Sequence, residues 1–269
     1  MRKTLLLLSM CFATAAGWAE SDSIVDSKIK TASRMIGVGM TNILDTYLSQ
    51  EKFEGTGITY LSSVERHKPE SSWSTLTEHQ ANISVTNDRN DKANELEGAY
   101  DFYWGKLYQW TLLDGKLQLQ GGGMANAGIG VIYNTINGNN PAQARLHLNI
   151  MPTAVARYQF KLFGKKASAR YEMQLPLIGV MFSPNYGQSY YEIFSLGNYD
   201  HNAVATTFAS APNFRQQIML DVNISKKLTM RIGYLGDYQQ AKVNNLKQHI
   251  YSHRMMIGIV KNFRLINYM

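Results

Sequence analysis

One long segment of the chain, residues 183–211, carries the residue types of a hydrolase with an oxygen nucleophile. It holds Ser189, Asp200 and His201, and a further carboxylate, Asp45, belongs to another segment that we expect at the same rim. Such an enzyme needs a hydroxyl to attack, an imidazole to take its proton and a carboxylate to orient the imidazole. One interpretation is therefore a catalytic group of these four residues.

The spacing of these residues favours a structural role instead. Membrane phospholipases of the barrel type carry His and Ser two positions apart on one strand, and no His-x-Ser sequence occurs here. Polar loop residues most often cap helices and satisfy backbone groups. We therefore expect residues 186–194 to form a short amphipathic helix or plug, with Asp200 and His201 as its capping and hydrogen-bonding residues.

Other side chains of the same segments could bind a ligand. These candidates are Asn42, Tyr186, Tyr190, Glu192 and Asn202. We expect no metal site and no cofactor. His249 and His253 would lie about 13 Å apart along a strand, too far to share one metal ion.

The elements that must position these residues are strands, because apolar and polar residues alternate with a period of two. In residues 142–163, for example, Leu146 and Leu148 alternate with Arg145 and His147. An ordinary strand has about 5–6 residues, whereas a strand that crosses a bilayer needs about 9–11. A soluble sandwich also alternates, but the length of these segments favours a membrane barrel.

The predicted connections support the barrel. We predict ten strands, at residues 33–41, 53–66, 72–86, 95–112, 115–134, 142–163, 166–182, 212–225, 227–241 and 247–263. Every odd-numbered connection is longer than its even neighbours, as in outer-membrane barrels with long extracellular loops and short periplasmic turns. The fold class is thus all-β: a single up-and-down antiparallel transmembrane β-barrel with a partly helical extracellular loop at its mouth. A hairpin hidden in 183–211 would raise the number of strands to twelve.

The two ends of the chain lie outside the predicted barrel. Residues 1–19 have the basic start, apolar core and small residues before a cleavage site that define a signal peptide, although Cys11 leaves a lipoprotein signal as an alternative. We expect a periplasmic segment at 20–32, the barrel at 33–263 and an extension at 264–269. Loss of Arg2 and Lys3 lowers the formal charge from +7 to +5. That charge is dispersed, so no nucleic-acid partner is expected.

Inward-facing charges predict a narrow lumen that is sealed by ion pairs. The expected lumen residues are Arg145, His147, Arg157, Arg170 and Glu172. Barrels of about eight strands are filled by side chains, whereas wide pores need about sixteen. The leading hypothesis is a non-enzymatic surface protein, or a membrane-assembly or anchoring protein, with a plugged lumen in the outer membrane. The alternatives are a hydrolase at the extracellular mouth (lipid A deacylase, phospholipase or rim protease) and a small channel. Expected partners are outer-membrane lipid or lipopolysaccharide and other envelope proteins.

The long loop contains too many apolar residues for a solvated tether. They are Tyr186, Tyr190, Tyr191, Ile193, Phe194, Leu196 and Tyr199. Structureless loops longer than about 12–15 residues are uncommon. Because this loop has 29 residues, we expect 183–211 to be ordered. The segment is predicted to fold as a lid or plug docked on residues 42–49, with Gly187 and Gly197 at its start and stop.

Three stretches resemble an uncharacterised family of Gram-negative outer-membrane proteins that contain a domain of unknown function. They are residues 41–49, residues 182–202 with Phe182-Ser-Pro-Asn-Tyr-Gly at the start, and residues 233–247. The resemblance spans most of the mature chain. It implies a barrel and an outer-membrane address, and it implies no activity.

Overall fold

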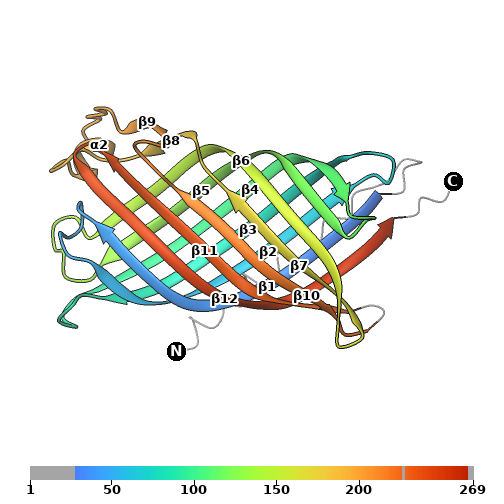
Figure 1. Cartoon of the computed structure of the whole chain (residues 1–269). Helices are drawn as coiled ribbons and strands as arrows, with labels where there is room; N and C mark the ends of the chain where they lie inside the picture. The colour runs from blue at the N-terminus through green and yellow to red at the C-terminus, as the bar shows by residue number, and fades with distance from the viewer. Residues whose placement is uncertain (1–27, 226–227, 266–269) are drawn as a thin grey trace.

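The computed structural model describes residues 28–225 and 228–265. Twelve strands and one short helix of this part of the chain form a closed antiparallel barrel with additions at one end (Figure 1). No helix within these ranges has the length and apolarity needed to cross a membrane. The predicted signal peptide, most of the predicted periplasmic segment and residues 266–269 lie outside the described residues.

Ten strands make up the wall, and the first pairs with the last. β1 (Lys28–Asp45) is bonded along its length to β12 (Leu246–Leu265), with Asp45 opposite Gln248 at one end. The other wall strands, in order, are β2 (Phe53–His67), β3 (Trp73–Asn87), β4 (Asn94–Leu112), β5 (Leu117–Asn134), β6 (Ala142–Leu162), β7 (Lys165–Gln174), β10 (Phe214–Asn223) and β11 (Thr229–Val243). The additional strands are β8 (Ile178–Phe182) and β9 (Ala203–Thr207). The predicted ten-stranded antiparallel barrel is confirmed.

The outer strand ends differ from those expected. β1 begins at Lys28, inside the segment predicted to be periplasmic. β12 runs to Leu265, two residues into the predicted C-terminal extension. Both strands continue past their predicted ends, because β1 and β12 pair with each other as far as Lys28 and Leu265.

The two rims of the barrel carry different connections. We call the end with residues 46–52, 88–93, 135–141, 183–213 and 244–245 the loop rim, and the end with residues 68–72, 113–116, 163–164 and 224–228 the turn rim. The expected difference in length holds for the first seven connections. It is wrong for the ninth, which is a tight turn of Asn244 and Asn245 with φ of 51° and 59°. Asn tolerates this left-handed backbone, which two-residue hairpins of type I′ require.

The predicted seventh strand, 166–182, is interrupted at Pro176. β7 ends with Gln174 opposite Thr153, and β8 resumes opposite Ile150 of the same neighbour, β6. This strand advances four residues, from 174 to 178, while β6 advances three, from 153 to 150, so the strand has a β-bulge here. Pro176, within the bulge, has no N–H to donate to the sheet. Beyond the bulge the strand pairs with β9 instead of β10. This hairpin accounts for the twelve-strand alternative, although only ten strands close the barrel.

The interior of the barrel is packed with side chains. One apolar cluster lies inside β3 to β6 and consists of Leu76, Tyr103, Leu107, Met124, Met151 and Val155. A second cluster consists of Met35, Leu61, Met219, Leu235 and Met256. Because all of these residues are buried on the inner face, the lumen is a core rather than a wide pore.

Candidate functional site

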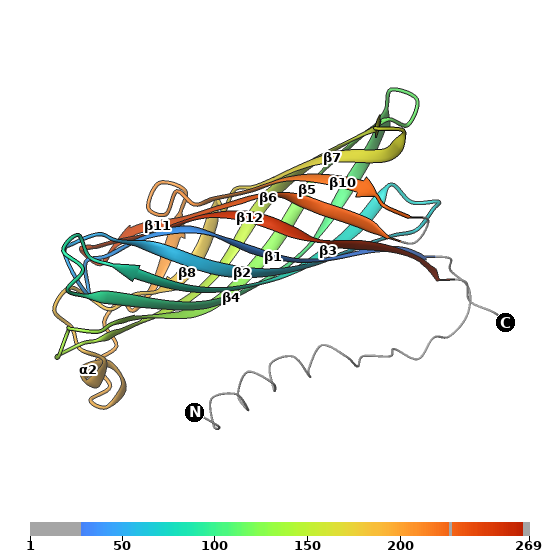
Figure 2. The same ribbon diagram turned by 90° about the horizontal axis from the view of Figure 1, so that it is seen from below.

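The long loop at the loop rim is ordered around the helix α2 (Tyr190–Phe194) (Figures 1 and 2). Ser189 caps its first turn: the hydroxyl accepts from the backbone N–H of Glu192, and the Glu192 carboxylate accepts from the Ser189 N–H at 2.7 Å. This reciprocal pair is a capping box. Gly187 and Gly197 have positive φ on either side of the helix, which confirms their predicted roles as start and stop.

The loop docks on the connection between β1 and β2, as predicted. The Tyr47 hydroxyl donates to the carbonyl of Gln188 at 3.0 Å, and the rings of Tyr47 and Tyr190 meet edge to face. The Tyr190 hydroxyl donates to Gln143 Oε1 and accepts from the N–H of Ala144. Burial, with help from the nearby Asp45 and Glu192 carboxylates, raises the pKa of Tyr47 to about 12. Both hydroxyls therefore stay protonated and act as structural donors.

A plug would bury the apolar residues of the loop, and this expectation is wrong for most of them. Ile193 is fully buried, but five apolar residues of the loop are 57–71% exposed: Tyr186, Tyr191, Phe194, Leu196 and Tyr199. Helix α2 is only five residues long: Ile193 is its one buried residue, and Tyr190 is partly buried. The loop is thus a docked structure with an exposed aromatic surface.

The predicted catalytic side chains have separate partners. The Ser189 hydroxyl lies 3.0 Å from Glu192 Oε2. His201 Nδ1 lies 2.5 Å from Asp200 Oδ1, and both side chains are mostly exposed. Asp45 is buried and accepts from the N–H of Tyr47. The structure thus pairs His201 with Asp200, while the hydrogen bonds of Ser189 go to the capping box.

The other predicted binding residues serve as tethers. The Asn202 amide donates to the carbonyl of Ser183 and to Gln188 Oε1, and so closes the loop on itself. Asn42 lies near the end of β1, where its amide donates to Glu54. Tyr186 holds the loop to the last hairpin through its backbone N–H, which donates to the Asn244 carbonyl.

A buried polar layer crosses the middle of the lumen. We use this name for Glu78, Arg170, Glu172, Gln174, Arg215 and Gln217, all of which are no more than 4% exposed. Arg215 donates to Glu78 Oε2 at 2.9 Å and lies over the ring of Tyr103 at 4.5 Å. Arg170 pairs with Glu172. Two predicted lumen residues, Arg170 and Glu172, thus belong to one network that spans β3, β7 and β10.

The remaining predicted lumen residues also have cross-strand partners. Arg157 pairs with Glu65 at 3.1 Å. Arg145 donates to Gln239 at 2.6 Å. His147 Nε2 lies 3.1 Å from Asp101 and 2.9 Å from Asn126 Oδ1.

Arg254 was not among the predicted lumen residues, although it is the largest fully buried side chain in the described part of the chain. Its guanidinium donates to Thr59, Thr41 and Ser84 from three neighbouring strands. The sequence contained the signal, because Arg254 alternates with the apolar residues Met255 and Ile257, and a period of two places it on the opposite face.

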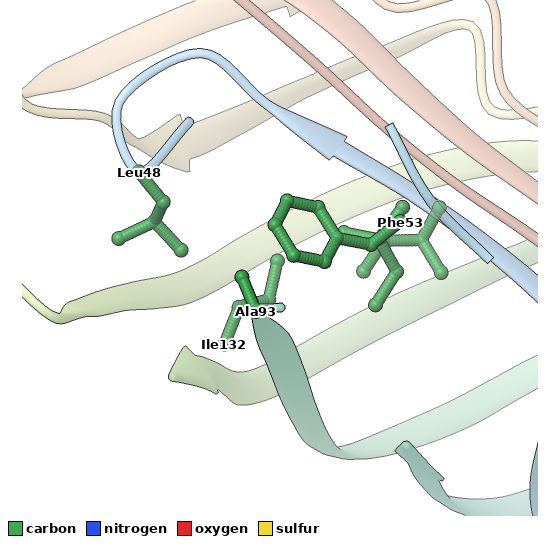
Figure 3. Packing of buried hydrophobic residues seen from close by; sticks show 6 residues of the cluster. Leu48, Phe53, Ala93 and Ile132 are labelled. Carbon is green, nitrogen blue, oxygen red and sulfur yellow. The ribbon is translucent and has the colours of Figure 1, made fainter. Parts of the chain in front are cut away.

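A second layer closes the mouth with apolar groups. The mouth layer consists of Ile43, Leu48, Phe53, Ala93, Ile132 and Ile250, with Tyr47 against it (Figure 3). Leu48 and Ala93 come from connections at the loop rim, so two loops tuck into the opening. The 183–213 segment supplies none of these residues.

A small cavity lies between the two layers. It has a volume of about 60 Å³, is partly open, and its lining includes Ile132, Ile250, Arg215, His147 and Asp237. This volume is large enough for a few water molecules. Among the residues that the structure describes, no group of three or more His, Cys, Asp and Glu is placed to bind a metal ion.

The chain is similar to one protein family and to several solved structures. Residues 4–268 match the family described as "Protein of unknown function (DUF3316)". No curated protein matches this chain. Similar solved structures include the outer-membrane protease OmpT from Escherichia coli, with 8% identity over 91% of this chain and 99% of that one and a TM-score of 0.48. The translocator domain of the autotransporter NalP from Neisseria meningitidis has 10% identity over 97% and 96% and a TM-score of 0.40. Neisserial surface protein A has 7% identity over 87% and 97% and a TM-score of 0.38.

Proposed function

The chain belongs to the DUF3316 family, and we propose that it is a non-conducting barrel of the outer membrane that anchors an ordered recognition loop at the cell surface. The observation that carries this proposal is the double closure of the lumen. A protein that conducts or secretes through its barrel needs a continuous aqueous path, whereas this barrel is blocked at two depths.

The polar layer is the deeper block. Glu78 and Glu172 are fully buried, and Arg215 bonds to Glu78 while lying 3.8 Å from Glu172. Removing one member of a buried ion pair costs about 3–5 kcal/mol. A passing solute would have to break such pairs.

The mouth layer is the outer block. Phe53 is 2% exposed, and Ile43 and Ile132 are no more than 1% exposed. These apolar side chains offer no hydrogen bonds of their own to a file of water. The polar layer depends on ion pairs and hydrogen bonds, whereas the mouth layer depends on apolar packing. A change that disrupts one layer therefore need not disrupt the other.

The ordered loop is the functional part of this proposal. It presents Tyr191, Phe194 and Tyr199 on a segment held by the Ser189 capping box and by Tyr47. Exposed aromatic side chains on a rigid support are typical of recognition surfaces. The expected partner is another component of the envelope.

Planar bilayer recording tests the closure. The folded wild-type protein and a variant lacking residues 186–197 are expected to show no conductance steps, because both layers lie below the loop. A porin inserted under the same conditions is the positive control for the assay. Regular steps from the wild-type protein would refute the proposal and favour the small channel.

A further inference from the structure

The outer face of the barrel is not equally apolar all round. On β3 and β4 the lipid-type surface extends almost to the loop rim, where Val85 and Leu96 are exposed two residues from the strand ends. On β12 the outward positions nearest the same rim are Lys247, His249, Tyr251 and His253, and the first apolar one is Met255. The polar surface therefore reaches several residues deeper on this side.

The polar side chains on β11 and β12 are bonded to one another. Tyr234 lies 2.6 Å from His253 Nδ1 and 2.9 Å from the Tyr238 hydroxyl. The Tyr251 hydroxyl donates to Gln240 Oε1 at 2.6 Å. We call these five residues, Tyr234, Tyr238, Gln240, Tyr251 and His253, the polar row.

The neighbouring strands complete the polar row. His249 is only 7% exposed and supports the row from a covered position: it stacks on the Tyr251 ring at 4.3 Å, and its Nε2 lies 2.7 Å from Asn42 Oδ1. Gly236 makes room for the hydroxyls, because a Cβ there would lie 2.9 Å from that of Tyr234 and 3.0 Å from that of Tyr238. The row is a built surface and not a set of isolated polar residues.

Such a row is costly against hydrocarbon. Polar groups that face lipid chains must find partners within the protein, and the row meets only part of that need through its internal bonds. Tyr and His side chains at bilayer level suit the head-group region, where a polar tip meets polar ligands. A polar neighbour is therefore expected on this side of the barrel.

Two lysines at the top of the row indicate the charge of that neighbour. Lys242 and Lys247 stand directly opposite each other across β11 and β12, and both are exposed. Like charges in this register are destabilising unless an anion lies between them. Lys52 and Lys247 also act electrostatically on His249. Glu51 and Glu54 are exposed acids nearby, but neither stands in register with the two opposed lysines.

We propose that the outer face of β11 and β12 at the loop rim binds the anionic head group of a membrane lipid. Lys242 and Lys247 hold its phosphate, and the hydroxyl and imidazole groups of the row hydrogen-bond the rest of the head group. The acyl chains lie on the apolar surface directly below, which includes Met255 and Ile257. This continuity with the lipid-facing band favours a lipid over a soluble anion. The inference requires only the membrane placement in the proposed function and not the closed lumen.

Native mass spectrometry of the folded protein in micelles tests this site. Phosphatidylglycerol and phosphatidylcholine with the same acyl chains are titrated in parallel, and retained lipids are counted. The wild-type protein is expected to retain the anionic lipid selectively. The variant Lys242→Gln/Lys247→Gln is expected to bind it roughly tenfold to thirtyfold more weakly, because each basic side chain near an anionic surface contributes to binding.

A control pair exists at the other end of the barrel. Lys161 and Lys166 are also opposed across two strands, at the turn rim, but in the inward-facing rows that hold Arg157 and Arg170. The variant Lys161→Gln/Lys166→Gln is expected to retain the lipid as the wild type does. Both variants are first checked for folding by their heat-dependent gel mobility. Equal retention of the two lipids by the wild type, equal loss in both variants, or a mass of two chains in place of bound lipid would each overturn the proposal.

Discussion

Replacement of Arg215 by Met tests the polar layer directly. Arg215 donates to Glu78, Gln174 and Gln80, and its guanidinium lies over Tyr103. Met keeps much of the length of the aliphatic stem but removes the charge and every donor. The change leaves Glu78 buried with hydrogen bonds from Gln217 and Gln174 and without its cation.

The expected cost follows from the burial of this pair. Glu78 is 0% exposed and Arg215 is 4% exposed, so solvent does not screen the lost charge. Breaking one side of such a pair costs about 3–5 kcal/mol, whereas replacing both partners by uncharged groups is often close to neutral. The double variant Arg215→Met/Glu78→Gln should therefore recover most of the loss.

Unfolding by guanidinium in lipid vesicles, followed by tryptophan fluorescence, measures both effects. Arg66→Met is the control, since Arg66 is exposed near the turn rim and should change the free energy of unfolding by less than about 0.5 kcal/mol. A loss below about 1 kcal/mol for Arg215→Met would refute the argument. Equal losses in the single and double variants would refute it as well.

Two further predictions concern the loop rim. Chymotrypsin added to intact cells should cut within residues 183–211, where Tyr191 and Phe194 are exposed, while trypsin should spare Lys165 and Lys166 at the turn rim; tryptic cleavage there from outside would invert the topology. The capping box should respond to acid, because the Ser189 N–H and hydroxyl lower the pKa of the Glu192 carboxyl below its ordinary 4.5. A lowered pKa stabilises the folded loop fully above 4.5, and this contribution disappears as the pH falls through the folded value. The protection of the amides in 189–195, measured as exchange relative to the intrinsic rate at each pH, should therefore fall there in the wild type and not in Glu192→Gln.

Alternation along the chain was enough to predict the barrel. Each strand exposes one row of side chains to lipid and one to the interior. A period of two over more than about 9–11 residues therefore predicts both a β-strand and its location in a membrane. The inward direction of Arg145, His147 and Arg170 followed from the same rule. The capping box was missed although Ser189 and Glu192 have the required spacing, because Asp200 and His201 were assigned the capping role.

Connections were predicted less well, since they depend on single residues. Pro176 removes one ladder bond, and the following strand pairs with β9. Residues 175–182 form a continuous apolar run, so the sequence pattern does not reveal this change of partner. Two asparagines convert the ninth connection into a tight turn. Burial in the long loop depended on the space left at the mouth, which Leu48 and Phe53 already occupy.

The sequence by itself determined the strands, the face that each side chain uses and the rim to which each connection belongs, because these are local properties of an extended backbone. Only the tertiary structure decided which side chains meet across the lumen. Gln80 and Arg215 are 135 positions apart, and Thr59 and Arg254 are 195 apart. Such pairs depend on strand stagger and barrel closure, which sum over all ten wall strands. For the same reason the two lumen layers and the opposed lysines of the last hairpin became visible only once the register was known.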